Sequence, residues 1–329
     1  MGEWSVVETL VPEGASLIFR GSTCREWTSP DRLSPAADVR VGPLIETVRR
    51  TGEALSVTRR SERGKHPTFR IDAHPVLGPS GEPHGVQVWV GAPDEEPTPP
   101  RITSGVSWLL HRQVIAQTVE ACLMSGVQPD DCLPERTPAE YFAKSVRFDD
   151  EMGLLGLALD PVDGGKWLGE FSVLHADGRI MLWQCAARAR VDPGREGIQV
   201  LWHDISDVKA PALPSLSVLG LRETLAGTGF HAGLFALDLP MLSMWVSDPP
   251  PWVQWRDLPQ GARDILHPDD RRVLTTAHER FLREAPAEIG TEARLRGQRG
   301  TWVRTLLRIT PYPGDMGKRL AVVRMTLPH

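Results

Sequence analysis

The sequence has few cysteines and tyrosines and no long uninterrupted apolar run. Its 329 residues include 4 cysteines and 2 tyrosines, and no CxxC arrangement occurs. This spacing argues against a disulfide scaffold and a zinc site, and it predicts a reducing environment. The longest nearly apolar stretch, Gly233 to Val246, contains Asp238 and Pro240 and is too short to span a bilayer. With no secretory signal pattern visible, we expect a cytoplasmic protein.

The cysteines themselves are too scattered to form a recognisable site. Cys122, Cys132 and Cys185 are expected to be small apolar side chains, buried or half-buried. Cys24 follows Ser22 and Thr23, which is not the context of a reactive cysteine in a flavin-binding photosensor. We therefore assign no chemistry to any cysteine.

The composition is that of a folded protein with more acidic than basic groups. Hydrophobic residues make up 41% of the chain and charged residues 24%, which excludes disorder as the main state. The net charge of −5 disfavours a broad surface for nucleic acid. At roughly 100–150 residues per domain, the length suits two or three domains.

One pattern of strands recurs three times along the chain. Each copy has a strand, a tight turn, a long strand, a turn containing proline or glycine, and a final strand. The copies run from Leu55 to Gly91, from Phe171 to Ile205 and from Thr291 to Thr326. Asp177-Gly178 in the second copy is a strong hairpin signal, because glycine tolerates the positive φ that such turns require.

A helix is predicted before the strands in each copy, and in the second copy Asp149-Asp150-Glu151 leads into it. Gly52 would end the first helix as its C-cap, and His267 to Asp270 would begin the third. The apolar positions of the first helix are Val41, Leu44, Ile45 and Val48. Those of the third are Val273, Leu274, Ala277, Phe281 and Leu282. Both sets follow helical periodicity.

The repeats predict an α+β fold of three tandem modules, each a central antiparallel sheet with helices packed on one side. The modules would occupy residues 1–95, 101–208 and 216–329. Two proline-rich stretches, Ala92 to Pro100 and Asp207 to Ser217, would connect them without regular structure.

Two of the three copies resemble sensory domains of the PAS superfamily and the related GAF domains. ILHPDDRRVLTTAHERFL followed by EARLRGQRGTWVRTLLRITPY is similar to the helix-to-sheet half of a PAS domain. KWLGEFSVLHADGRIMLWQ and IQVLWHDISD are similar to a PAS domain as well, although a GAF domain is the alternative for this module. Three such modules without an output domain resemble actinobacterial PAS–GAF–PAS tandem proteins.

The resemblance implies a non-catalytic cytoplasmic signalling protein that senses or relays a signal to a partner protein. No phosphate-binding loop, dinucleotide fingerprint or hydrolase motif occurs, and no haem, flavin or metal signature identifies a cofactor. A small-molecule ligand and self-association remain open, and nucleic acid and a membrane span are not expected. The alternatives are a structural scaffold of degenerate modules and, less favoured, a cryptic enzyme.

A ligand would occupy the space between sheet and helix in the third module. Its walls would come from Val273, Ala277, Phe281, Trp302 and Leu306, which otherwise form plain core.

Two further groups in this module suggest a partner surface. Trp245, Trp252 and Trp255 flank a run of prolines and would either contact a partner or pack locally. Arg304 and Arg308 share one strand face, which would be solvated or would meet an anionic ligand or acidic partner.

Overall fold

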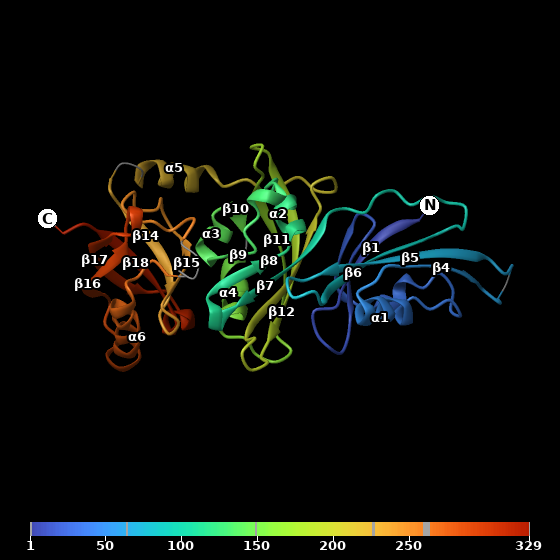
Figure 1. The fold of residues 1–329 in the computed structure, drawn as a ribbon, viewed down its shortest axis with the longest axis horizontal. Coiled ribbons are helices and arrows are strands. Elements are labelled where there is room, and N and C mark those ends of the chain that lie inside the picture. The colour runs from blue at the N-terminus through green and yellow to red at the C-terminus, as the bar shows by residue number, and fades with distance from the viewer. Residues whose placement is uncertain (1, 64, 149, 226–227, 259–263, 329) are drawn as a thin grey trace. The chain divides into compact units, whose positions relative to one another are not determined.

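The chain divides into two compact units. The computed structural model describes residues 2–63, 65–148, 150–225, 228–258 and 264–328. Unit 1 comprises residues 1–109, 116–134 and 146–212, and unit 2 comprises residues 110–115, 135–145 and 213–329 (Figure 1). The first sheet along the chain and most strands of the second belong to unit 1, and the third sheet belongs to unit 2.

Three sheets, mostly antiparallel, contain the strands of the described chain. The first has the order β3-β2-β1-β6-β5-β4, the second β10-β11-β12-β13-β7-β8-β9, and the third β15-β14-β18-β17-β16. The strands of the first sheet are β1 (Glu3–Glu8), β2 (Ser16–Arg20), β3 (Thr23–Thr28), β4 (Leu55–Arg60), β5 (Thr68–Leu77) and β6 (Pro83–Gly91). Those of the second are β7 (Thr103–Leu109), β8 (Val114–Gln117), β9 (Glu135–Arg136), β10 (Ser145–Phe148), β11 (Lys166–Leu174), β12 (Ile180–Arg190) and β13 (Gly197–Asp204). Those of the third are β14 (His231–Ala236), β15 (Met241–Trp245), β16 (Ile289–Arg296), β17 (Trp302–Pro311) and β18 (Leu320–Thr326).

Short helices accompany the sheets, so the predicted α+β class is confirmed. The α-helices are α1 (Gly42–Thr51), α2 (Val119–Met124), α3 (Pro138–Phe142), α4 (Glu151–Leu159), α5 (Leu216–Leu225) and α6 (Arg272–Glu284). The 3-10 helices are η1 (Pro30–Leu33), η2 (Leu110–Arg112), η3 (Pro129–Asp131), η4 (Pro268–Asp270), η5 (Gln298–Gly300) and η6 (Asp315–Lys318).

The same order of five strands recurs in all three sheets. In each, the first two strands are neighbours, the last strand pairs with the first, and the last three form the predicted meander. The five strands in spatial order are β2-β1-β6-β5-β4, β8-β7-β13-β12-β11 and β15-β14-β18-β17-β16. Strand β3 in the first sheet and strands β9 and β10 in the second are additions at the edges.

Helix α1 forms where its apolar periodicity predicts it. Ile45 and Val48 point into an apolar core with the first sheet, and they are 2% and 0% exposed. Gly52 ends the helix with φ 68°, and its amide donates to Val48 O at 2.8 Å. A left-handed C-cap of this kind is where glycine is preferred, because it has no Cβ to clash.

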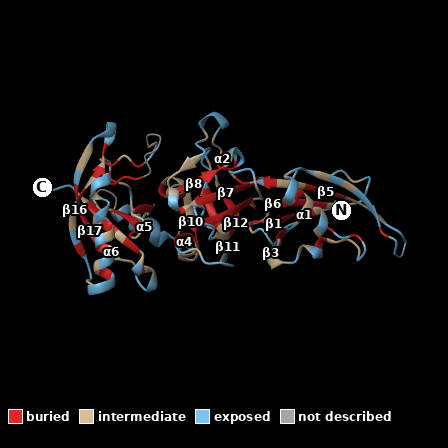
Figure 2. Ribbon diagram, turned by 60° about the horizontal axis from the view of Figure 1, so that its bottom comes forward, coloured by how far each residue is buried: buried red, intermediate tan, exposed pale blue. Residues whose placement is uncertain are grey.

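The two sheets of unit 1 pack directly on one another. Figure 2 shows buried residues along β1, β6, β7 and β12. The apolar cluster at the contact combines Val6, Leu10, Ile18, Phe19 and Val76 with Leu182, Ala186, Leu201 and Ile205. Burial of apolar surface at about 25 cal/mol per Å² makes such a cluster the main source of stability at the contact.

Two glycines allow the sheets to approach this closely. A Cβ on Gly85 would lie 2.6 Å from Leu201 Cδ2. A Cβ on Gly105 would lie 2.5 Å from Leu77 O and 2.8 Å from the Cα of Gly78. Neither glycine has a positive φ, so backbone conformation does not require glycine here. Glycine is required because a side chain would not fit between the sheets.

Two local predictions need correction. Helix α5 begins at Leu216, inside the stretch from Asp207 to Ser217 that was expected to lack regular structure. Cys122 is buried and Cys132 half-buried as predicted, but the expectation of a reducing environment without disulfides is wrong for this pair, which forms a disulfide with Cα atoms 5.8 Å apart. Helix α2 and η3 fold back on each other and bring the two together, whereas Cys24 is exposed and Cys185 is buried, both free.

We predict that Gly105→Ala lowers the free energy of unfolding by about 2 kcal/mol, because the new methyl group would overlap backbone atoms that cannot move aside. Urea unfolding followed by circular dichroism measures the change. Gly290→Ala is the matched control, since no heavy atom lies within 4 Å of its Cβ position in β16. Equal stability of the two variants would contradict the close packing of the sheets.

We predict that the Cys122→Ser/Cys132→Ser variant loses about 2–3 kcal/mol of stability, because the bond closes a short loop in the unfolded chain. The loop spans a sequence separation of 10. Urea unfolding measures the loss, and peptide mapping without reductant should recover the linked pair. Cys24→Ser should leave stability unchanged. Alkylation of both Cys122 and Cys132 in the unreduced protein would disprove the pairing.

Candidate functional site

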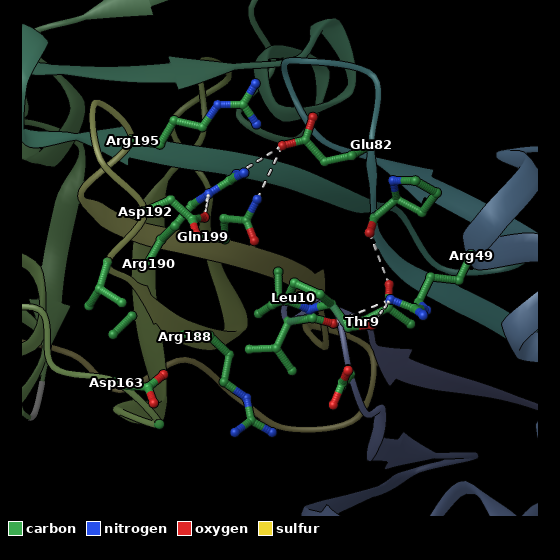
Figure 3. Close-up of a pocket in the computed structure, with 17 residues that line it drawn as sticks. Thr9, Leu10, Arg49, Glu82, Asp163, Arg188, Arg190, Asp192, Arg195 and Gln199 are labelled. Carbon is green, nitrogen blue, oxygen red and sulfur yellow. Dashed lines mark hydrogen bonds and ion pairs between the residues drawn. The ribbon is translucent and has the colours of Figure 1, made fainter.

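Unit 1 contains a cleft of about 710 Å³ at one end of its two packed sheets. One wall comes from the turn after β1, helix α1 and the β5–β6 turn. The other comes from the α4–β11 turn, β12 and the β12–β13 hairpin. Figure 3 shows side chains from both walls pointing into the space. The charged lining residues are Glu13, Arg49, Glu82, Asp163, Arg188, Arg190, Asp192 and Arg195.

Two arginines of β12 pair with glutamates from the first sheet and its turn. Arg188 Nη2 donates to Glu8 Oε1 at 2.7 Å. Arg190 Nη1 donates to Glu82 Oε1 at 3.2 Å, and its Nε donates to Asp192 Oδ2 at 2.9 Å. Because Glu8 ends β1 and Glu82 lies in the β5–β6 turn, each pair joins the two sheets across the cleft.

The Arg188–Glu8 pair is almost withdrawn from solvent. The Glu8 side chain is 0% exposed and that of Arg188 is 15% exposed. Arg188 also donates to Ser16 Oγ at 3.2 Å, and its guanidinium stacks 4.3 Å from the Trp27 ring centroid. Removing one partner of a buried pair leaves an uncompensated charge, so this pair fixes the floor of the cleft.

Glu82 is held in its ionised form by its hydrogen bonds. Burial raises its pKa, but its own backbone amide, Ser80 and Arg190 together outweigh burial and lower the pKa overall. Gln199 Nε2 adds a hydrogen bond to Glu82 Oε1 at 3.1 Å. Charged Glu82 thus orients both Arg190 and Gln199 at the cleft wall.

The other two arginines of the cleft differ in whether their side chains already have hydrogen-bond or ion-pair partners in the protein. Arg49 pairs with Glu46 at 2.6 Å and also donates to Pro12 O. Within the described part of the chain, the Arg195 side chain has no hydrogen bond or ion pair, and it is exposed at the cleft. Arg195 is therefore the cleft cation that a ligand can reach without displacing an existing partner.

The cleft chemistry suits binding of a polar ligand. Guanidinium groups donate in a planar fork that matches carboxylate and phosphate oxygens. The one hydroxyl side chain among the lining residues, on Thr9, donates to Pro83 O at 3.0 Å. We therefore identify the arginines as the groups that would hold a ligand.

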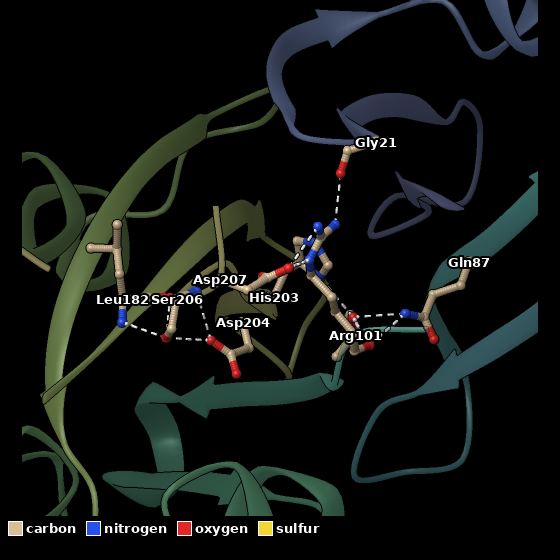
Figure 4. A network of polar contacts seen from close by, with 9 residues as sticks. Gly21, Gln87, Arg101, Leu182, His203, Asp204, Ser206 and Asp207 are labelled. Carbon is tan, nitrogen blue, oxygen red and sulfur yellow. Dashed lines mark hydrogen bonds and ion pairs between the residues drawn. The ribbon is translucent and has the colours of Figure 1, made fainter. Parts of the chain in front are cut away.

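A second polar network joins the two sheets of unit 1 away from the cleft (Figure 4). Arg101, in the segment between the sheets, donates from Nε and Nη2 to Asp207 at 2.7 and 2.9 Å. Its Nη1 donates to Gly21 O at 2.6 Å, and its guanidinium lies 5.4 Å from the Phe19 ring centroid. Arg101, which precedes β7 of the second sheet, therefore connects Asp207, at the start of the second predicted linker, with β2 of the first sheet.

His203 lies buried beside this network. Its Nδ1 is 2.9 Å from Thr103 Oγ1, and its ring contacts Phe19 edge-on at 4.7 Å between centroids. Burial and the nearby Arg101 lower the pKa of His203 to about 3. His84 is similarly buried, with Nδ1 3.0 Å from Val200 O, and burial lowers its pKa as well. Both rings are neutral at physiological pH.

The five residues predicted to line a ligand pocket in unit 2 do not surround one space. Ala277 and Phe281 are buried in the apolar core of the unit, and Val273 packs against it. Strand β17 presents Leu307 and Ile309 to that core. Successive side chains of a strand point to opposite faces, so Trp302 and Leu306 lie on the other face. The prediction that Trp302 and Leu306 line a pocket together with α6 is therefore wrong.

The three tryptophans predicted as a partner surface pack within unit 2. Trp255 belongs to its core, and Trp245 and Trp252 pack against it. The rings of Trp245 and Trp255 are 5.8 Å apart, and Trp252 contacts His231 at 5.0 Å. Local packing, the alternative considered for these residues, accounts for their positions.

The cleft residues were missed by sequence reasoning. They come from separate turns and strand ends, and none forms a recognisable motif. Charged residues at the ends of predicted strands could have indicated the cleft, because binding groups often lie on the loops that follow strands.

No α-helix in the described ranges is long and apolar enough to cross a bilayer.

Comparisons with known proteins establish the fold. Residues 3–100 match the model of the family described as Rv3651-like, N-terminal. No curated protein matches the sequence. A crystal structure of an uncharacterised protein from Mycobacterium tuberculosis is similar over 99% of this chain and 96% of that chain, with 25% identity and a TM-score of 0.80.

Two sensory proteins show much weaker likeness. A sensory box histidine kinase/response regulator from Burkholderia thailandensis has 17% identity and a TM-score of 0.27, covering 38% of this chain and 89% of that one. An RNA-binding light-oxygen-voltage receptor has 12% identity and a TM-score of 0.27, covering 68% and 95%. Similarity at this level does not by itself establish a shared function.

We predict that the free energy of unfolding falls as the pH falls from about 6.5 towards 3. Over this range His203 binds a proton in the unfolded chain, whereas in the folded protein its pKa of about 3 keeps it neutral. The contribution of His203 amounts to about 2 kcal/mol between pH 7 and pH 5. Urea unfolding at several pH values measures it.

His203→Asn should reduce this loss by about 2 kcal/mol, since asparagine does not titrate. A His203→Asn variant with the wild-type pH dependence would show that His203 is not buried in its neutral form.

Proposed function

We propose that this chain is a non-catalytic signalling protein whose PAS- or GAF-like modules sense or relay a signal to a partner protein. The cleft of unit 1 would be its ligand site. The observation that carries this proposal is the cleft of about 710 Å³, which is lined by charged groups from two packed sheets. The recurring order of five strands supports the assignment of repeated modules.

The relay would work through the charge pairs that join the sheets. A ligand carboxylate or phosphate that binds Arg195 and reaches Arg190 would compete with Glu82, which comes from the other sheet. Such a ligand would favour one arrangement of the sheets over another, which is the thermodynamic basis of a conformational signal. Binding energy would thereby be converted into a change at the contact between modules.

A sensor site between sheet and helix is less well supported. Apolar side chains of the two cores fill the space between each of α1 and α6 and the sheet it faces. The open space beside α6, about 350 Å³, lies at the C-terminal end of that helix, against the β17–β18 turn. A ligand in unit 1 would instead bind at the ends of the strands. If no ligand binds there, the structural scaffold becomes the better account.

We predict that a di- or tricarboxylate or a nucleoside monophosphate raises the melting temperature in a thermal-shift screen, because a ligand that binds only the folded state stabilises it. Arg195→Gln should abolish the shift without lowering the intrinsic melting temperature, since Arg195 has no partner in the described structure. Arg59→Gln, an exposed arginine on β4, is the matched control. The absence of any shift, or an unchanged shift in Arg195→Gln, would contradict the proposal.

A further inference from the structure

The outer face of the third sheet carries arginines in direct opposition. Along β17, Arg304, Leu306 and Arg308 alternate with buried residues and therefore share the outer face. In the antiparallel register, Arg304 lies directly opposite Arg294 of β16, and Arg308 lies directly opposite Arg324 of β18. We call Arg304, Leu306, Arg308 and Arg324 the arginine face.

Direct opposition of like charges is unfavourable in a sheet. Arg324 has no ion pair within the described ranges, and its guanidinium lies 5.3 Å from the Phe230 ring centroid. Arg308 therefore faces an uncompensated positive charge across the strands. If this face served only to contact solvent, opposite charges at Arg308 and Arg324 would make the sheet more stable than two arginines do.

The acids near this face neutralise it only in part. Arg294, opposite Arg304, is paired with Asp269 and Asp270, so the uncompensated opposition is that of Arg308 and Arg324. Arg304 contacts Glu292 at 2.6 Å, and Arg308 contacts Glu288 at 3.4 Å. The two arginine side chains remain 71% and 64% exposed. Exposed ion pairs of this kind are weak, so both guanidinium groups keep donors for another carboxylate.

We propose that the arginine face binds an extended acidic segment of a partner protein. The segment would carry two carboxylates with an apolar side chain midway between them at alternate positions. Alternate residues of a strand are about 6.7 Å apart, so Arg304 and Arg308 would meet carboxylates about 13 Å apart. Leu306, partly buried between them, would contact the apolar side chain. This inference names the partner chemistry that the proposed signalling function requires.

A peptide fits this surface better than a nucleic acid does. Glu288 and Glu292 lie within reach of the arginines and would repel a continuous row of phosphates. Leu306 offers apolar contact that a phosphate backbone does not use. The chain as a whole carries a net charge of −5, which disfavours non-specific binding to nucleic acid.

Fluorescence anisotropy with the full-length chain tests the inference. The probe is a labelled peptide containing Glu-Thr-Leu-Thr-Glu, and its control replaces both glutamates by glutamine. We expect the glutamate peptide to bind at least about tenfold more tightly at low salt, and the difference to shrink as salt is added. Arg304→Glu/Arg308→Glu should weaken binding by about tenfold or more.

Two matched variants separate this site from the cleft and from general charge. Arg59→Glu/Arg60→Glu makes the same charge change on exposed β4 and should bind within about twofold of wild type. Arg195→Gln should bind the peptide like wild type. A result that contradicts the cleft proposal would therefore leave peptide binding to the arginine face unchanged. Circular dichroism checks folding, and Arg304→Gln/Arg308→Gln replaces the reversal variant if that one does not fold.

The inference is overturned if the two peptides bind equally, or if the reversal or neutral variant of Arg304 and Arg308 binds like wild type. It is also overturned if single-stranded DNA of equal charge binds the arginine face more tightly than the glutamate peptide does.

Discussion

The direct packing of two sheets in unit 1 is the constraint on which the remaining structure of this unit depends. Gly85 and Gly105 leave room for it, since a Cβ at either position would lie 2.6 Å or less from an atom across the contact. The close approach buries His84 and His203, because each ring lies where the sheets meet. It also brings strand ends from both sheets to the rim of one cleft.

In the proposed function, charge pairs make this contact responsive to a ligand as well as stable. Glu8–Arg188 is buried and would be costly to break, whereas Glu82–Arg190 lies at the cleft and is half-exposed. A ligand that competes for the exposed pair would act on the contact while the buried pair preserved the fold. Apolar packing thus sets where the sheets meet, and the proposed function assigns the adjustment of their arrangement to the polar rim.

Local features were predictable from the sequence, and features created by distant segments were not. The strand meanders and the end of α1 at Gly52 follow from alternation and turn chemistry, which act over a few residues. The disulfide at Cys122 depends on the fold of an irregular loop, which no periodicity encodes. Leu306 was assigned to the wrong face, although its two-residue spacing from Arg304 and Arg308 indicates the outer one.

Hydrogen–deuterium exchange of the full chain tests most directly whether the two sheets of unit 1 form one cooperative body. The account predicts that peptides covering β6 and β13 exchange with the same opening free energy, and that Gly105→Ala accelerates both together. If β6 opens and exchanges while β13 stays protected, the sheets are independent modules, and the cleft between them has no fixed geometry.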